Sequence, residues 1–372
     1  MSFRDDFSGY GDRAEARKNA LGALIRAVQT LATLDAATFE HPLSRVWLRV
    51  EREFAAAGAL ALLDQSDVGI SSILAARLRS TAVPWGHVSL ALVDDRIRDW
   101  RQVAMRKGSP RFRDLVSQIA PARGERDLVH LADKVAAALW ACVGRSWTRS
   151  TVPASLDTLV ASDRSVIDVA DIALAIPFAL RRSGATRALL PAVCGRISLL
   201  TGQDGDGLPG LERWFQSIET QAHDAHARLR LIERYTSQAA RQLLDIRRPA
   251  ALRRAVDLGL RSWAIWGPQF ARVTGVEPSS AWRTLEQARE LGLVVVVPGQ
   301  SRSRGDGTLY TIPPWLQFAG LAQAPRGRPR AVGRRAIQPP APDHDLTAAL
   351  DEADDALAAI DAILARRTQW SA

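Results

Sequence analysis

Hydrophobic residues recur at intervals of three and four through the first 245 residues, a spacing that indicates amphipathic helices. The pattern predicts helices around residues 21–34, 45–64, 66–79, 87–105, 127–143 and 165–182. Residues 208–244 form the longest run, which would extend roughly 50 Å as one helix or be divided into two. Alternating strand patterns are absent from this region, so the sequence predicts an all-helical body over residues 1–248.

The pattern changes after Pro249. A short apolar helix is expected at residues 268–274, followed by Gly275 and by a second helix from about Pro278 to Leu291. Glycine tolerates the positive φ that a tight turn between helices requires, and proline suits the first turn of a helix. Two helices joined by so short a turn predict a helix-turn-helix, whose second helix is placed to enter the DNA major groove.

The second helix has two distinct faces. Its apolar stripe consists of Ala281, Leu285, Ala288 and Leu291. The side chains expected to face DNA are Ser279, Ser280, Trp282, Arg283 and Gln287. Arginine pairs with guanine and glutamine with adenine in direct readout of base edges. The alternative interpretation is the same fold used only for packing or for contact with a protein.

A hairpin is predicted directly after this helix. Residues 293–297 and 308–312 have strand character, and a polar turn at residues 299–307 separates them. Arg302 and Arg304 lie in that turn, where they would reach a phosphate or the minor groove. The predicted fold is therefore mainly α: a multi-helix body, a winged helix-turn-helix domain over residues 249–318 with a small β-hairpin wing, and a C-terminal helix.

A basic linker over residues 319–343 follows the predicted wing. Its core, Pro-Arg-Gly-Arg-Pro-Arg, resembles an AT-hook, in which glycine lets the backbone reach the floor of the groove. Arg326, Arg328 and Arg330 would then enter the narrow minor groove of A·T tracts. A solvated linker rich in arginine and proline is the alternative.

The charge distribution agrees with a polyanionic partner. The chain carries 49 Lys and Arg against 40 Asp and Glu, a formal net charge of +9 and a pI near 10.5. Residues 249–343 hold 13 arginines and 6 acidic residues, so most of the excess lies in the part predicted to bind double-stranded DNA.

The tail over residues 344–372 has a heptad pattern. Its apolar residues alternate in steps of four and three: Leu346, Leu350, Ala353, Leu357, Ile360 and Leu364. This spacing is typical of a coiled-coil seam. A homodimer through Leu350, Leu357, Ile360 and Leu364 is one interpretation, and docking of the helix onto the same chain is the other.

Motifs for cofactors, metals or membranes were sought and not found. Cys142 and Cys194 provide neither a disulfide framework nor a zinc cluster. His223 and His226 lack further ligands in a metal-binding pattern and are expected at a helix surface. The N-terminus lacks an apolar signal segment and no run is long enough to span a bilayer, so we expect a cytoplasmic protein without cofactor, metal or membrane partner.

One region resembles a known family. Residues 171–184, 189–193 and 211–222 are similar in helix order and apolar pattern to the helices after the active-site loop of Fic proteins, many of which continue into a winged helix. The order also resembles a set of uncharacterised rhizobial plasmid proteins that end in a helix-turn-helix. The resemblance implies a Fic-like scaffold over about residues 165–245.

The catalytic signature of Fic proteins is absent from this sequence. That signature contains His-Pro-Phe and Gly-Asn-Gly-Arg, whereas residues 160–171 hold neither histidine nor glycine. No residue is therefore assigned a catalytic role. The sequence favours a DNA-binding transcriptional regulator of a bacterial or plasmid locus. The alternatives are a non-catalytic adaptor in plasmid replication, partition or conjugation and a divergent Fic-type nucleotidyl transferase.

Overall fold

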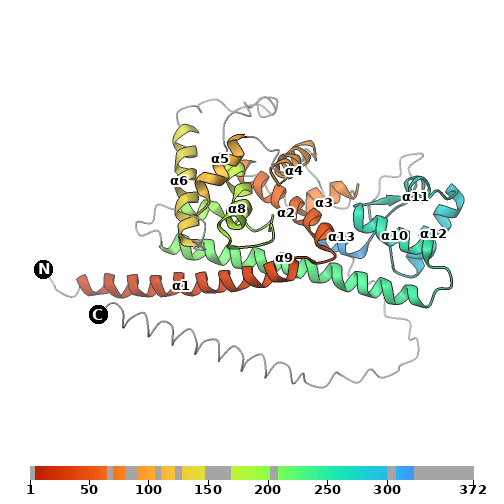
Figure 1. Cartoon of the computed structure of the whole chain (residues 1–372), viewed down its shortest axis with the longest axis horizontal. Helices are drawn as coiled ribbons and strands as arrows, with labels where there is room; N and C mark the ends of the chain where they lie inside the picture. The colour runs from red at the N-terminus through yellow and green to blue at the C-terminus, as the bar shows by residue number, and fades with distance from the viewer. Residues whose placement is uncertain are drawn as a thin grey trace, which may run out of the picture. The chain divides into compact units, whose positions relative to one another are not determined.

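The computed structural model describes residues 5–64, 70–80, 90–104, 110–121, 128–146, 169–201, 208–299 and 307–321. Within these ranges the chain is mainly helical, with one small antiparallel sheet (Figure 1). The chain divides into two units, residues 1–322 and residues 323–372, and all the described residues belong to the first. The boundaries predicted at residues 248, 318 and 343 remain predictions.

The helical body precedes the sheet in the sequence. Its elements are α1 (Asp5–Thr38), α2 (Ser44–Asp64), α3 (Ile70–Arg77), α4 (Leu90–Ala104), α5 (Pro110–Ile119), α6 (Leu128–Ser146), α8 (Val169–Ser183), η1 (Ile197–Thr201) and α9 (Leu208–Leu244). The elements that follow are α10 (Ala250–Arg261), β1 (Ile265–Trp266), α11 (Gly267–Thr274), α12 (Pro278–Glu290), β2 (Val295–Val296), β3 (Leu309–Thr311) and α13 (Pro313–Phe318).

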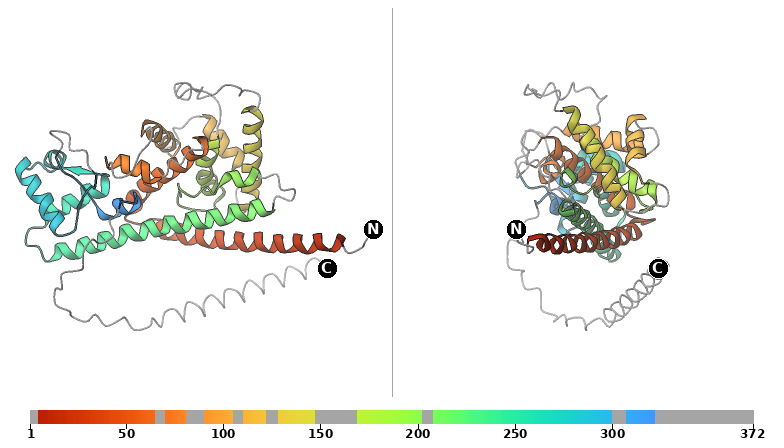
Figure 2. Two further views of the ribbon diagram at one scale, coloured as in Figure 1. Left: turned by 180° about the vertical axis from the view of Figure 1, so that it is seen from behind. Right: turned by 90° about the vertical axis from the view of Figure 1, so that its left-hand side faces the viewer.

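The long helix α9 is unbroken over its 37 residues, which settles the choice between one helix and two. At 1.5 Å per residue it extends roughly 55 Å. α1 lies alongside it in both orientations of the molecule (Figures 1 and 2). The predicted apolar stripe of α9 is confirmed, since Trp214, Ile218, Ala222 and Leu229 are fully buried.

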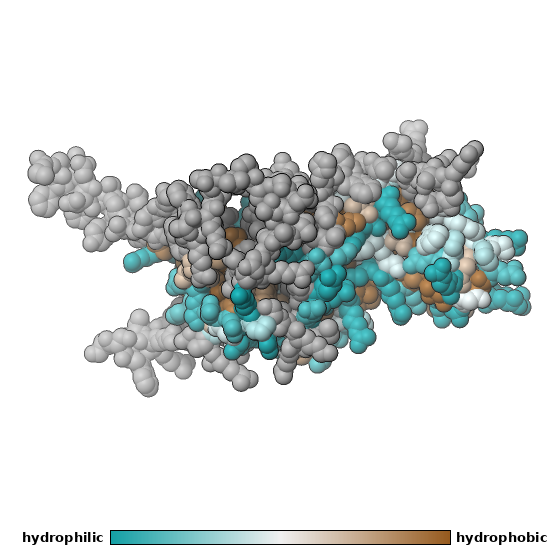
Figure 3. Space-filling view, turned by 90° about the horizontal axis from the view of Figure 1, so that it is seen from above, coloured by the Kyte–Doolittle hydropathy of each residue, from teal (hydrophilic) through white to brown (hydrophobic). Residues whose placement is uncertain are grey.

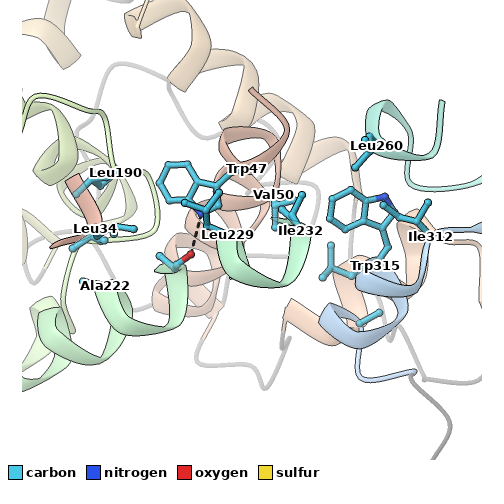
Figure 4. Packing of buried hydrophobic residues seen from close by; sticks show 14 of the residues in the cluster. Leu34, Trp47, Val50, Leu190, Ala222, Leu229, Ile232, Leu260, Ile312 and Trp315 are labelled. Atoms are coloured by element: carbon cyan, nitrogen blue, oxygen red, sulfur yellow. Dashed lines mark hydrogen bonds between the residues drawn. The ribbon is translucent and has the colours of Figure 1, made fainter. Parts of the chain in front are cut away.

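The hydrophobic core continues along α9 into the C-terminal elements. In the close view, Trp47 of α2 packs beside Leu229, and its indole Nε1 donates to the carbonyl oxygen of Ala225 at 3.0 Å (Figure 4). Further along, Trp315 of α13 lies beside Leu260 and Ile312. Because buried residues of both regions belong to one cluster, the core runs past residue 248 without interruption.

A buried ion pair fixes α2 against α9. The carboxylate of Glu51 is fully buried and accepts from Arg228 Nε at 2.5 Å and from Arg228 Nη2 at 2.8 Å. The Arg228 guanidinium also lies 4.0 Å from the ring centroid of Phe54. Such two-point geometry is what allows a pair of charges to leave water without a large net cost.

The sheet joins three short strands in the order β1–β3–β2, all antiparallel. Ile265 pairs with Tyr310, and Val295 pairs with Thr311. The hydroxyl of Tyr235, on α9, donates to the carbonyl oxygen of Leu293 at 2.8 Å, so the helix contacts the segment leading into β2 directly.

Several elements differ from the sequence prediction. α5, η1, α10, α13 and β1 were not predicted. β1 has only two residues, too few to show an alternating pattern. α3 begins at Ile70 rather than near residue 66, and the strand predicted over residues 293–297 is limited to Val295–Val296. Among the described helices, none combines the length and apolarity needed to cross a bilayer.

Replacing Arg228 by Met is expected to destabilise the protein by about 3–5 kcal/mol, because it leaves the buried Glu51 carboxylate without its partner. The matched change Arg230→Met removes an exposed cation that pairs with Glu233 at 3.2 Å and should cost about 0–1 kcal/mol. Urea denaturation followed by circular dichroism measures both. An equal loss in the free energy of unfolding for the two variants would contradict the assigned role of the buried ion pair.

Candidate nucleic-acid interface

The turn between α11 and α12 has the backbone geometry that the sequence predicted. Gly275 ends α11 in the left-handed conformation, with φ of 71°, and its N–H donates to the carbonyl oxygen of Ala271 at 2.9 Å. Glu277 is extended, and Pro278 then opens α12 at a position where its missing N–H costs nothing. Glycine suits residue 275 because side chains with a Cβ atom rarely adopt this φ.

The apolar side of α12 faces inward. Ala281, Leu285 and Ala288 are completely buried, against α10 and α11. These three positions were predicted from spacing alone, and they are confirmed. Leu291, the fourth residue of the predicted stripe, is half-buried at the end of the helix.

The polar side of α12 faces solvent. Ser279, Ser280, Arg283 and Gln287 are all exposed. Within the described part of the chain, the side chains of Arg283 and Gln287 make no hydrogen bond or ion pair. Spaced four residues apart, these two side chains share one helix face. Their donor and acceptor groups are available to a partner.

Trp282 is set apart from these residues. Its ring is half-buried and packs on the backbone of Gly267 and Gly307, where an added Cβ atom would come within 2.3 and 2.6 Å of it. The ring centroid lies 6.2 Å from that of Tyr310. The structure therefore uses Trp282 to seat α12 on the sheet, and we leave it out of the candidate contacts.

A polar cluster connects α12 to β3. The hydroxyl of Tyr310 donates to Glu286, and Arg289 Nε donates to the same carboxylate at 2.8 Å. These bonds, led by that from Tyr310, lower the pKa of Glu286, while burial and this carboxylate raise the pKa of Tyr310. Glu286 is therefore ionised at neutral pH, and its carboxylate already accepts hydrogen bonds from Tyr310 and Arg289.

Two neighbouring cations were not singled out from the sequence. Arg272 of α11 is exposed, and Arg254 of α10 donates from Nη1 to the carbonyl oxygen of Thr274 at 3.1 Å, beside the turn. Hydrophilic side chains project at the right of the space-filling view, where Figure 1 places α11 and α12, with hydrophobic residues among them (Figure 3). One exposed hydrophobic residue of α11 is Val273, at 63 %.

The remaining predicted contacts lie outside the described residues. They are Arg302 and Arg304 of the hairpin turn and Arg326, Arg328 and Arg330 of the basic linker. The residues proposed for a dimer seam also lie outside: Leu350, Leu357, Ile360 and Leu364. Their assignments stay predictions.

The remaining candidates for metal or nucleophilic chemistry in the described ranges are histidines, cysteines and acidic residues. Within these ranges, no three side chains of His, Cys, Asp or Glu gather closely enough to hold an ion. His226 is half-buried on α9, and burial lowers its pKa. Burial also raises the pKa of the Cys194 thiol to about 11, so this thiol is protonated and unreactive at neutral pH.

Comparison with protein-family models, curated proteins and solved structures found no match to this chain. The resemblance to Fic proteins and to the rhizobial helix-turn-helix proteins therefore stays a prediction.

Replacing Gly267 by Ala is expected to destabilise the protein by about 1–3 kcal/mol, because the new methyl group would collide with the Trp282 ring. Gly58→Ala is the control, since that glycine lies in α2 with no atom within 4 Å of an added Cβ. Alanine favours a helix by roughly 1 kcal/mol over glycine, so the control should be stabilised. Thermal denaturation measures the Tm of both variants. A shift of Tm in the same direction for Gly267→Ala and Gly58→Ala would contradict the packing of Trp282.

Proposed function

We propose that residues 249–318 form a winged helix-turn-helix that binds double-stranded DNA, with α12 as the recognition helix. The observation that carries the proposal is the exposed polar face of α12, where Arg283 and Gln287 have no partner in the described part of the chain. Arginine reads guanine and glutamine reads adenine through paired hydrogen bonds in the major groove.

The order of elements supports this proposal. A helix, a strand, two helices and a hairpin follow one another as α10, β1, α11, α12, β2 and β3, the succession expected of a winged helix. The segment between Gly299 and Gly307 carries Arg302 and Arg304 and would be the wing. Ser279 and Ser280, exposed in the first turn of α12, are placed to donate to phosphates.

The charge of the region also supports DNA as the partner. α12 itself is balanced, because Glu286 and Glu290 offset Arg283 and Arg289. The excess of arginine comes from α10, α11, the hairpin turn and the basic linker, which are the parts that would contact the backbone. Base contacts from α12 would then supply specificity, and the surrounding arginines would supply affinity.

Arg283→Ala should weaken binding to a preferred duplex by about 1–3 kcal/mol and relax base preference, because a two-point contact to one base would be lost. Arg113→Ala removes the same charge from an exposed position of α5 and is the control. Selection from random duplexes followed by fluorescence anisotropy provides the measurement. The proposal fails if no duplex is bound, or if the two variants bind every duplex equally.

Replacing Arg326 and Arg328 together by Ala should weaken binding about evenly across sequences, because the linker would contact the sugar–phosphate backbone and the groove floor. The logarithm of the binding constant should also depend less steeply on salt, since fewer counterions are released. Titrations over a salt series measure the slope. An unchanged slope would exclude the linker from the interface.

A further inference from the structure

A pocket lies between the helical body and the start of the sheet. It has a volume of about 410 Å³, within the range of small-molecule sites. Its lining residues come from α2, α3 and α4 on one side and from the end of α10 and the next two residues on the other: Arg49, Glu53, Arg77, Asp94, Ile97, Arg98, Arg101, Arg261, Ser262 and Trp263.

The two carboxylates of the pocket are already occupied. Arg77 donates from Nη2 to Glu53 at 3.2 Å and to Asp94 at 2.6 Å, so both acids share one cation. Arg98 is paired outside this group, with Asp95 at 2.7 Å. Within the described part of the chain, Arg49, Arg101 and Arg261 make no ion pair, so the pocket has an excess of positive charge.

Arg49 is the least satisfied of these cations. Its Nε and Nη2 atoms are buried without a hydrogen-bond partner. The guanidinium carbon lies 4.8 Å from the ring centroid of Trp263 and 5.3 Å from that of Trp315. The two indoles hold the group in place. Nη1 is not among the buried nitrogen atoms, so it is the donor of Arg49 that an anion in the pocket can reach.

Without a ligand, burial and mutual repulsion disfavour the charged forms of the arginines at this site. Burial lowers the pKa of Arg49 to about 10; Glu53 opposes this change, and the neighbouring Arg101 adds to it. Arg52, on the same helix, has its pKa lowered to about 10 by burial and again by Arg101. Desolvated cations that repel one another are stabilised by an added anion, which restores their ordinary pKa.

We propose that this pocket binds a small polyanion of the phosphate or carboxylate class, held by the guanidinium groups of Arg49, Arg101 and Arg261. The ligand is small because the pocket has a volume of only about 410 Å³. Arg77 keeps its two acids and is not part of the ligand set.

Contacts behind the pocket link it to the sheet. Trp263 lies two residues before β1, and its carbonyl oxygen accepts from Thr311 Oγ1 of β3 at 2.6 Å. Trp315 Nε1 donates to the carbonyl oxygens of Gly259 and Ser262 at 2.8 and 3.1 Å. A ligand held by Arg101 of α4 and Arg261 of α10 would therefore bias how the C-terminal elements sit on the body, a regulatory role that rests on the proposed DNA binding.

The test measures anion binding to the full chain without DNA. Pyrophosphate and citrate represent the phosphate and carboxylate classes, with sodium chloride at matched ionic strength as the reference. Either anion at a hundred times its dissociation constant should raise Tm by roughly 3–5 °C. Calorimetric titration of the same samples gives the stoichiometry, expected to be one per chain.

Three variants locate the site. Arg101→Gln and Arg49→Met should abolish the shift in Tm, whereas Arg113→Gln on exposed α5 should retain it. Arg49→Met should also leave the ligand-free Tm unchanged or raised, because it removes a buried cation with unpaired N–H groups. The proposal is overturned if neither anion shifts Tm, if all three variants respond alike, or if Arg49→Met lowers the ligand-free Tm while still responding to the anions.

Binding measurements with DNA test this proposal separately from the proposed function. The anion that binds should change affinity for a preferred duplex at least about fivefold in the wild type and not in Arg101→Gln. If an anion binds but no DNA duplex does, the proposed anion site is supported and the proposed function is overturned. DNA binding that ignores a bound anion would overturn the regulatory role alone.

Discussion

The continuous apolar stripe of α9 is the constraint on which the rest of the structure depends. Its buried residues run from Trp214 to Leu243, so one helix supplies core to α1, to α2 and to the C-terminal elements. Because a rigid helix cannot adjust at one end independently of the other, the contact from Tyr235 to Leu293 connects the elements leading to α12 with the body. The exposed face of α12 is therefore supported by α9 and the helical body as well as by the small sheet.

The polar contacts around this scaffold divide into satisfied and unsatisfied groups. Glu51 with Arg228, and Arg77 with its two acids, are closed arrangements that hold helices together. Arg49 and Arg283 are different, since neither makes an ion pair in the described ranges. Both have donor groups without a partner in the described ranges, one beneath two indoles and the other in solvent. The proposed anion site and the proposed DNA contact rest on that difference.

Sequence periodicity predicted the long helices and the two faces of α12 because each repeats over several turns. Gly275 was predictable as well, since its φ is a local property of the turn. The packing of Trp282 was not predictable, because it depends on Gly267 and Gly307. These glycines are distant in sequence and offer room only by lacking a side chain. The pocket was missed for the same reason: α2, α4 and the residues after α10 meet only in the folded chain.

Hydrogen–deuterium exchange of the full chain with and without a bound duplex tests the central claim most directly. The account predicts slower exchange over residues 278–290, where α12 would lie in the groove, and no change in α5 or α8, which lie elsewhere in the body. Protection confined to the helical body, with residues 278–290 exchanging as they do in the free protein, would contradict it.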